Sequence, residues 1–133
     1  MSHIYLLYPL TSKMRPINKK KNKKTGKPNI YPEANNEDLK FGIHKSGGIK
    51  TLESRYKYYI GDYNAKLIIE DTYEKLLIFE DRLRKVFSKY INNFKKRPHA
   101  SYTQEWMSGI TFEEAEKIIK DEFEKFNNRM KAE

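Results

Sequence analysis

Two side chains in the first half of the chain have the types and the spacing to bind a phosphate group. Arg55 and Tyr59 lie four residues apart in a segment that we expect to be helical, and side chains at that spacing are neighbours on a helix surface. The pair Gly47-Gly48 precedes the segment and predicts a turn with free backbone N–H groups. Arginine, phenol and backbone N–H groups together suit a phosphate. A solvated arginine beside a half-buried tyrosine fits the same spacing.

Glu80 is the second residue with chemistry to offer. It falls at the edge of an apolar stripe in the segment 73–92, which has the 3.6-residue period of an amphipathic helix. A carboxylate on a core-facing edge has to be paired with a cation, protonated or bound to a metal ion. The sequence leaves two interpretations open, a metal site and a salt bridge to Arg84 or another basic side chain. The stripe consists of Leu76, Phe79, Leu83, Val86, Phe87 and Tyr90.

Three segments have the residue pattern of β-strands. In 3–8 the residues Ile4, Leu6 and Tyr8 face one way and their neighbours the other, and apolar residues also alternate over 39–44. A central apolar run fills 65–70. We therefore expect a small three-stranded sheet. The short piece around Trp106 has no pattern that assigns it to a strand or a helix.

Three helices are expected to flank that sheet. The first has Thr51 as its N-cap, and the second spans 73–92. The third begins after Thr111, which forms a capping box with Glu114. The order β-β-α-β-α-α makes the chain a single α+β domain over 1–133. The apolar face of the last helix holds Phe112, Ala115, Ile118, Ile119, Phe123 and Phe126.

The composition is that of one basic, folded domain. The 133 residues include 27 Lys and Arg against 18 Asp and Glu, and this net charge of +9 favours an anionic partner, with nucleic acid ahead of a membrane surface. Cysteine is absent, which excludes disulfides and thiolate zinc sites. The sequence has neither an apolar run of ~20 residues nor a signal-peptide pattern, so we expect no membrane span and no leader.

A basic, proline-containing segment at about 11–36 separates the first two strands. It has almost no apolar residues, and we expect a long basic loop inserted into the domain. Its lysines either follow a nucleic-acid backbone without reading sequence, or belong to a solvated loop or a localisation signal. These lysines are Lys19, Lys20, Lys21, Lys23, Lys24 and Lys27.

The motifs at the two strands resemble the signatures of the GIY-YIG nuclease superfamily, in its compact phage and large-virus branch. The triplet His3-Ile4-Tyr5 stands where that superfamily has G-I-Y. The triplet Lys40-Phe41-Gly42 stands at the second signature, which reads K-[IF]-G in this branch. His3 in place of glycine, Lys40 in place of tyrosine and a longer interval between the signatures are departures from the general pattern.

The resemblance continues through the rest of the chain in the same order. Arg55 matches the helix arginine of the superfamily, and Tyr59 matches its His/Tyr position. Glu80 matches the metal-ligand glutamate. The triplet Glu105-Trp106-Met107 is similar to the E-W-F that precedes the terminal helix in that branch.

This resemblance implies a metal-dependent DNA endonuclease that hydrolyses phosphodiester bonds. By resemblance, Glu80 would hold Mg²⁺ or Mn²⁺, and Arg55 would contact the scissile phosphate. Tyr5 would align or deprotonate the attacking water, with Lys40 lowering its pKa from about 10 or acting as the base itself. Tyr59 would hydrogen-bond the phosphate or the water.

The alternative function is a catalytically weak or inactive nucleic-acid-binding module with the same fold. The sequence leaves open which of Tyr5 and Lys40 is the general base, and whether the chain is a monomer or a homodimer. The expected partner is DNA, in the cytoplasm or in the nucleic-acid compartment of a virus-infected cell.

Overall fold

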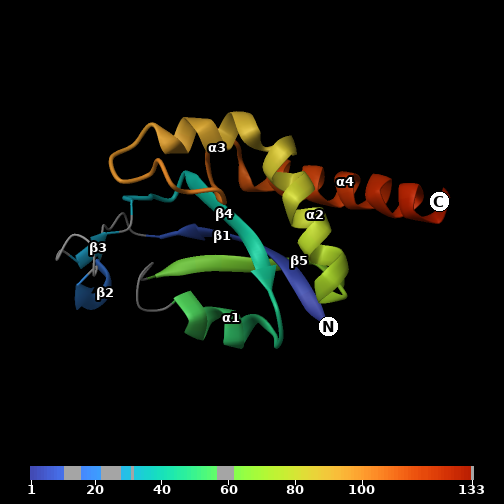
Figure 1. The fold of residues 1–133 in the computed structure, drawn as a ribbon, viewed down its shortest axis with the longest axis horizontal. Helices are drawn as coiled ribbons and strands as arrows, with labels where there is room; N and C mark the ends of the chain where they lie inside the picture. The colour runs from blue at the N-terminus through green and yellow to red at the C-terminus, as the bar shows by residue number, and fades with distance from the viewer. Residues whose placement is uncertain (11–15, 22–27, 31, 57–61, 133) are drawn as a thin grey trace.

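The chain folds as an α+β domain around a four-stranded antiparallel sheet (Figure 1). The computed structural model describes residues 1–10, 16–21, 28–30, 32–56 and 62–132. The strand order is β5-β1-β4-β6, so β1 and β4 are central. The strands are β1 (Ser2–Pro9), β4 (Asp38–His44), β5 (Tyr63–Asp71) and β6 (Trp106–Ser108).

The three predicted strands are confirmed, but the predicted count of three is wrong. The fourth strand, β6, pairs with β4 through the partners Asp38–Ser108, Leu39–Met107 and Lys40–Trp106. Three residues are too few to display an alternating pattern, which is why this piece could not be assigned from its sequence. Its pairing matters for the site, because it brings residues next to Trp106 alongside β4.

The inserted basic segment is only partly a loop. It contains β2 (Pro16–Lys21) and β3 (Pro28–Ile30), which pair antiparallel in a separate two-stranded sheet. The prediction of a loop throughout 11–36 is therefore wrong for these two strands. Backbone pairing needs no apolar side chains, so a lysine-rich segment offers no period that would reveal it.

The helices are α1 (Ile49–Tyr56), α2 (Tyr73–Val86), α3 (Ser88–Lys95) and α4 (Phe112–Ala132). The prediction that Thr111 caps α4 is confirmed, because the backbone N–H of Glu114 donates to the Thr111 hydroxyl at 3.2 Å. The N-cap prediction for α1 is wrong. That helix begins before Thr51, and the first-turn N–H of Leu52 donates to the Gly48 carbonyl at 3.2 Å.

The single helix predicted over 73–92 is in fact two, since the chain turns at Phe87 between α2 and α3. Phe87 has φ −93° and ψ 10°, and its carbonyl accepts from the N–H groups of both Tyr90 and Ile91. The turn keeps Phe87 in the core beside the sheet and directs Phe94 towards Trp106 in β6, where the two rings stack with centroids 5.4 Å apart.

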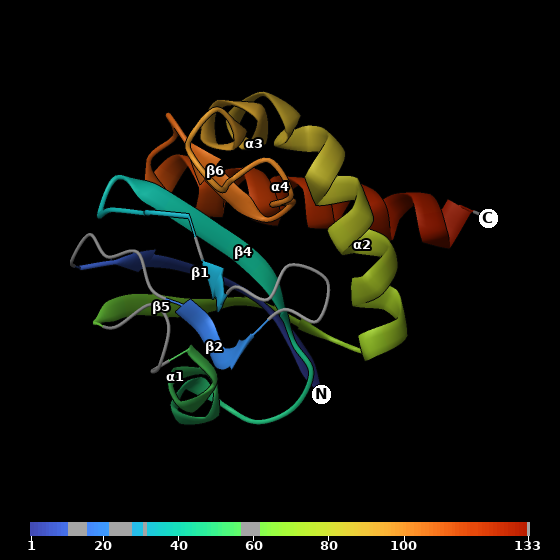
Figure 2. The same cartoon turned by 60° about the vertical axis from the view of Figure 1, so that its left-hand side comes forward.

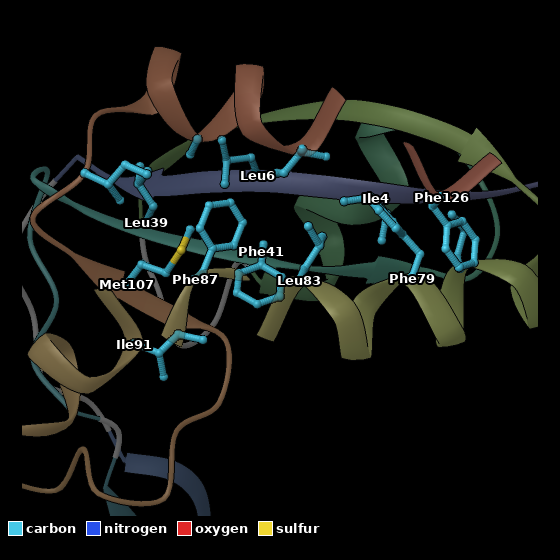
Figure 3. Packing of buried hydrophobic residues seen from close by; sticks show 14 residues of the cluster. Ile4, Leu6, Leu39, Phe41, Phe79, Leu83, Phe87, Ile91, Met107 and Phe126 are labelled. Atoms are coloured by element: carbon cyan, nitrogen blue, oxygen red, sulfur yellow. The ribbon is translucent and has the colours of Figure 1, made fainter. Parts of the chain in front are cut away.

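Helices cover both faces of the sheet, α2 and α4 on one and α1 on the other (Figures 1 and 2). Successive side chains of β1 point to opposite faces of the sheet. Ile4 and Leu6 pack on the side of α2 and α4, and Tyr5 and Leu7 pack on the side of α1. Figure 3 shows the first layer. Of the predicted stripe on α2, only Val86 is on the outside. The predicted α4 face lies in or against this core as a whole: Phe112, Ala115, Ile118, Ile119, Phe123 and Phe126.

Candidate functional site

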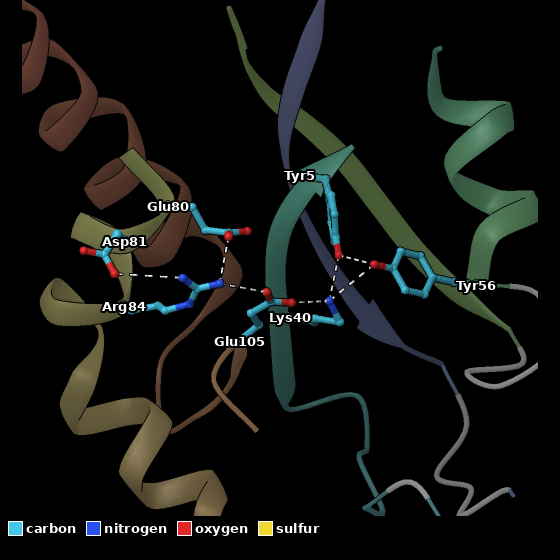
Figure 4. A network of polar contacts seen from close by, with 7 residues as sticks. All are labelled: Tyr5, Lys40, Tyr56, Glu80, Asp81, Arg84 and Glu105. Atoms are coloured by element: carbon cyan, nitrogen blue, oxygen red, sulfur yellow. Dashed lines mark hydrogen bonds and ion pairs between the residues drawn. The ribbon is translucent and has the colours of Figure 1, made fainter. Parts of the chain in front are cut away.

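A buried polar cluster of Tyr5, Lys40 and Tyr56 lies on the α1 side of the sheet (Figure 4). The Lys40 ammonium donates to the phenol oxygens of Tyr5 at 2.7 Å and Tyr56 at 3.3 Å. The two phenol oxygens also hydrogen-bond to one another. The Lys40 ammonium nitrogen lies 5.2 Å from the centroid of the Tyr5 ring and 5.1 Å from the centroid of the Tyr56 ring. The two rings thus supply both oxygen acceptors and π-faces to one buried cation.

The β1–β4 register explains how Tyr5 reaches Lys40. Tyr5 is paired with Gly42, so its ring lies on the same face as Lys40, two residues along β4. A Cβ on Gly42 would lie 2.5 Å from the Tyr5 hydroxyl and 2.8 Å from its Cζ. Glycine at this strand position therefore leaves the space in which the phenol lies.

Helix α1 contributes Tyr56 to the cluster, and β5 holds that tyrosine in place. The Tyr63 ring packs edge-on against Tyr56, and its phenol donates to the Leu52 carbonyl at 3.1 Å. Burial, followed by the nearby Glu53 and Tyr56, raises the pKa of Tyr63 to about 12. Tyr63 therefore stays a protonated donor at neutral pH and ties α1 to the sheet.

A chain of alternating charges leads from this cluster to α2 (Figure 4). The Lys40 ammonium is 2.9 Å from Oε2 of Glu105. The other oxygen of Glu105 accepts from Nη2 of Arg84 at 3.2 Å, and the same nitrogen donates to Oε1 of Glu80 at 2.7 Å. Two carboxylates thus share one guanidinium nitrogen, and Glu80 is connected to Tyr5 through Arg84, Glu105 and Lys40.

The two carboxylates have opposite electrostatic balances. Burial raises the pKa of Glu80 above its ordinary value, the charge of Glu105 raises it further, and Arg84 and Lys40 counteract only part of this. Burial also raises the pKa of Glu105, but its ion pairs with Lys40 and Arg84 outweigh that effect, so its pKa lies below the ordinary value. The cations beside Glu80 therefore offset only part of the cost of burying its charge.

A buried carboxylate that its cations compensate only in part is a chemically suitable ligand for a divalent cation. Mg²⁺ is commonly bound by one or two carboxylates with water filling its other positions. Arg84 occupies only Oε1 of Glu80, and Oε2 has no hydrogen-bond donor among the described residues. Within the same part of the chain, no cluster of three or more His, Asp or Glu side chains could hold a metal ion. The described residues therefore fit a metal site with one protein carboxylate, that of Glu80, because both oxygens of Glu105 already accept from Lys40 and Arg84.

Of the five predicted site residues, the described structure brings three into one network: Tyr5, Lys40 and Glu80. Arg55 lies in α1, but its side chain is outside what the structure describes, and Tyr59 lies outside the described residues. Of the predicted nucleic-acid contacts, Lys19, Lys20 and Lys21 lie in β2. Lys23, Lys24 and Lys27 fall outside the described residues.

Sequence reasoning missed three parts of this site. Tyr56 was given no role, although its ring is buried on the sheet side of α1 and its phenol meets Lys40. Glu105 precedes a strand of three residues, which is too short for a residue pattern to indicate where the Glu105 side chain points. Gly42 had a usable signal, since a glycine inside a strand often marks the close approach of another group.

Comparisons of the chain with protein-family models, with curated proteins and with solved structures found no match. Among the described residues, none of the helices has the length and apolar character needed to cross a membrane. The case for a function therefore depends on the geometry and chemistry of the cluster around Lys40.

Proposed function

We propose that the chain is a metal-dependent endonuclease that hydrolyses phosphodiester bonds in DNA, with a GIY-YIG-like arrangement of its strands, helices and site residues. The observation that carries the proposal is the 2.7 Å contact between Lys40 and the buried Tyr5 phenol, linked through Glu105 and Arg84 to the buried carboxylate of Glu80. A phosphodiesterase needs a proton acceptor, a counter-charge and a metal ligand, and the cluster has candidates for all three.

Tyr5 is the proposed group that aligns or deprotonates the attacking water. An ammonium that donates to a phenol oxygen stabilises the phenolate relative to the phenol, and it does so more strongly in a buried site than in water. Lys40 supplies that ammonium, and Glu105 holds the lysine in its charged form. Tyr56 gives the Tyr5 oxygen a second hydrogen-bond partner, which fixes the direction of the phenol.

Glu80 is the proposed ligand of Mg²⁺ or Mn²⁺, and the metal would supply positive charge to the scissile phosphate and the leaving oxygen. Arg84 positions the carboxylate by holding one of its oxygens. Arg55 and Tyr59 remain the proposed contacts to the phosphate from the α1 side. The net charge of +9, with Lys19, Lys20 and Lys21 in β2, supports DNA as the partner.

The test is nicking of a supercoiled plasmid by the wild type and single variants, with Mg²⁺, with Mn²⁺ and with EDTA. We expect Tyr5→Phe to lower the nicking rate by roughly 10²- to 10⁴-fold, the usual contribution of a general base. Glu80→Gln should abolish the metal-dependent rate. Tyr8→Phe is the matched control, because Tyr8 belongs to the same strand but packs on the opposite face. Nicking by Tyr5→Phe at the wild-type rate would overturn the role of the phenol.

A nucleic-acid-binding module without catalysis is the second candidate. The observation that favours it is the 2.7 Å contact between Arg84 and Glu80, because a carboxylate held by a guanidinium competes poorly for a metal ion. This candidate predicts that the wild type binds DNA but nicks no substrate with any divalent ion. Magnesium-dependent nicking that disappears in Glu80→Gln would exclude it.

A further inference from the structure

A cavity of about 320 Å³ opens directly beside the cluster. Lys40 and Glu105 form one side, and Tyr102, Gln104 and Trp106 form the rest of its lining with Thr103 and Arg84. Its volume is at the lower end of the range for small-ligand sites. The cavity therefore has room for one flat ring system within reach of Lys40.

Two aromatic side chains give this cavity its shape. Trp106 is buried and stacks on Phe94 with an interplanar angle of 14°, so its ring is a fixed wall. The Tyr102 side chain is 56% exposed, which is unusual for a large aromatic residue in this fold. The segment that carries it is held by Thr103, whose backbone N–H and hydroxyl both donate to the Ala100 carbonyl, at 3.0 and 2.9 Å.

Gln104 adds a polar group beside the exposed ring. Its side chain is exposed and has both a donor and an acceptor, the combination needed to hydrogen-bond the edge of a base. Burial raises the pKa of the Tyr102 phenol, so the ring stays neutral at physiological pH and presents no negative charge to a nucleotide. An exposed neutral aromatic ring is the usual platform for stacking an unpaired base, and here it lies beside the same cavity as Lys40 and Arg84.

We propose that this cavity binds an unstacked nucleobase next to the cleaved bond, with the base on Tyr102 and its edge at Gln104. The proposal rests on the proposed nuclease function for the position of the cleaved bond. A base reaches such a cavity only when it has left the double helix. The preferred substrate is therefore single-stranded or locally opened DNA, and a fully paired duplex binds more weakly.

Binding without metal tests this subsite separately from catalysis. A fluorescein-labelled single-stranded 12-mer and the matching duplex are titrated in EDTA and followed by anisotropy. We expect tighter binding of the single strand and a loss of about 5- to 100-fold in Tyr102→Ala, as base stacking on an aromatic ring typically contributes. Tyr102→Phe should keep the wild-type affinity. The matched control is Ile78→Ala, which removes a 61% exposed side chain on α2 away from the cavity.

The chain carries its own reporter, because Trp106 is its single tryptophan and lines the cavity. With the unlabelled oligonucleotides, the single strand should quench tryptophan fluorescence more than the duplex does. Equal affinities of wild type and Tyr102→Ala for the single strand, or no binding of either oligonucleotide, would overturn the subsite. If plasmid nicking persists in that case, the nuclease function stands. Single-strand binding that depends on Tyr102, without nicking by any divalent ion, would keep the subsite and overturn the nuclease.

Discussion

At the scale of single residues, the site depends on Gly42 having no side chain. The Tyr5 phenol lies over Gly42 and is 2.7 Å from the Lys40 ammonium, so its position is fixed from below by the backbone and from the side by the lysine. Tyr5 is fully buried, so other atoms surround the ring and leave it no free space to move into. Any side chain at position 42 must therefore displace Tyr5 from Lys40.

Gly42→Ala should weaken both folding and activity. The added Cβ would lie 2.5 Å from the Tyr5 hydroxyl, and overpacking a buried site costs about 1–3 kcal/mol. We expect the free energy of unfolding, measured in urea, to fall by that amount and plasmid nicking to fall as well. Gly48→Ala is the matched control, since no atom lies within 4 Å of a Cβ at that position. Equal losses in the two variants would show that the Tyr5 contact is not the cause.

Glu80, unlike Gly42, is a residue whose charged side chain lowers the stability of the fold. Burial and then the charge of Glu105 raise its pKa above the ordinary value of 4.5. A carboxyl whose pKa is higher in the folded than in the unfolded chain disfavours folding once it ionises. Its contribution to stability is therefore most favourable below pH 4.5 and is lost as the pH rises through the raised pKa. Such a carboxylate is typical of a site that binds a cation.

Glu80→Gln should consequently melt at a higher temperature than the wild type at pH 7, while losing metal-dependent nicking. The difference in melting temperature should shrink as the pH is lowered and disappear below pH 4.5, where both side chains are neutral. Thermal melts between pH 4 and pH 8 measure it. Asp81→Asn provides the control, because the Asp81 side chain is exposed on the same helix. A lower melting temperature of Glu80→Gln at pH 7 would instead identify Glu80 as a structural partner of Arg84.

At the scale of elements, what the sequence reveals depends on the length of each pattern. The strands β1, β4 and β5 and the helix α4 have enough residues to display a period, and their positions are confirmed. The three residues of β6 are too few for one. The turn at Phe87 involves neither glycine nor proline, so nothing local predicts it. Its cause is tertiary, because the stripe that packs on one face of the sheet at Phe87 continues at Phe94 against the other layer.

The same limit applies to the candidate site. Tyr5 and Lys40 were predicted from the resemblance of their strand motifs to a known family, and Glu80 from the same resemblance and from its place at the edge of an apolar helix stripe. The ion pairs that link these three residues were not predicted, because Glu105 reaches Lys40 only through the pairing of β6 with β4. The polar role of Tyr56 was not predicted either. Its ring is buried, but its hydroxyl accepts a hydrogen bond from Lys40. A helical pattern reports which side is buried, but it does not report what polar groups meet there.

One ion pair joins three of the elements around the site. Arg97, just after α3, contacts both oxygens of the fully buried Asp38 in β4, and it donates to the Ser108 hydroxyl in β6 at 3.1 Å. The Arg97 guanidinium also lies 4.9 Å from the centroid of the Phe94 ring. This arrangement holds β6, and with it Glu105, against the start of β4.

Arg97→Met should destabilise the fold by about 3 kcal/mol, because it leaves the Asp38 carboxylate buried without its cation. Urea denaturation measures the loss. Lys85→Met removes a cation whose side chain is 82% exposed and 4.0 Å from Asp81, and an exposed pair of that kind contributes less than about 1 kcal/mol. If the two variants unfold at the same urea concentration, the Asp38 pair does not hold the elements together.

At the scale of the whole molecule, two groups of lysines lie in distant regions, one in β2 and one in α4, where acidic residues accompany them. The pair of strands β2 and β3 lies at the opposite end of the molecule from the C-terminal end of α4 (Figure 1). Lys19, Lys20 and Lys21 belong to β2, and several lysines of α4 pair with glutamates of the same helix, as Lys120 does with Glu116. If the partner is attracted only by the net charge, the lysines of β2 and of α4 contribute equally to binding. If a DNA backbone lies in the proposed site, only one of the two groups contributes.

Replacing Lys19, Lys20 and Lys21 by glutamine should weaken DNA binding and reduce its dependence on salt. Each phosphate contact contributes about 0.9 to the slope of log affinity against log salt for duplex DNA, so three lost contacts lower the slope by about 2–3. Replacing the exposed Lys117, Lys120 and Lys125 of α4 changes the net charge equally and should leave the slope almost unchanged. Anisotropy titrations between 50 and 200 mM salt measure both. Equal slopes for the two triple variants would mean that β2 does not touch the DNA backbone, and that the positive charge acts only as a diffuse field around the protein.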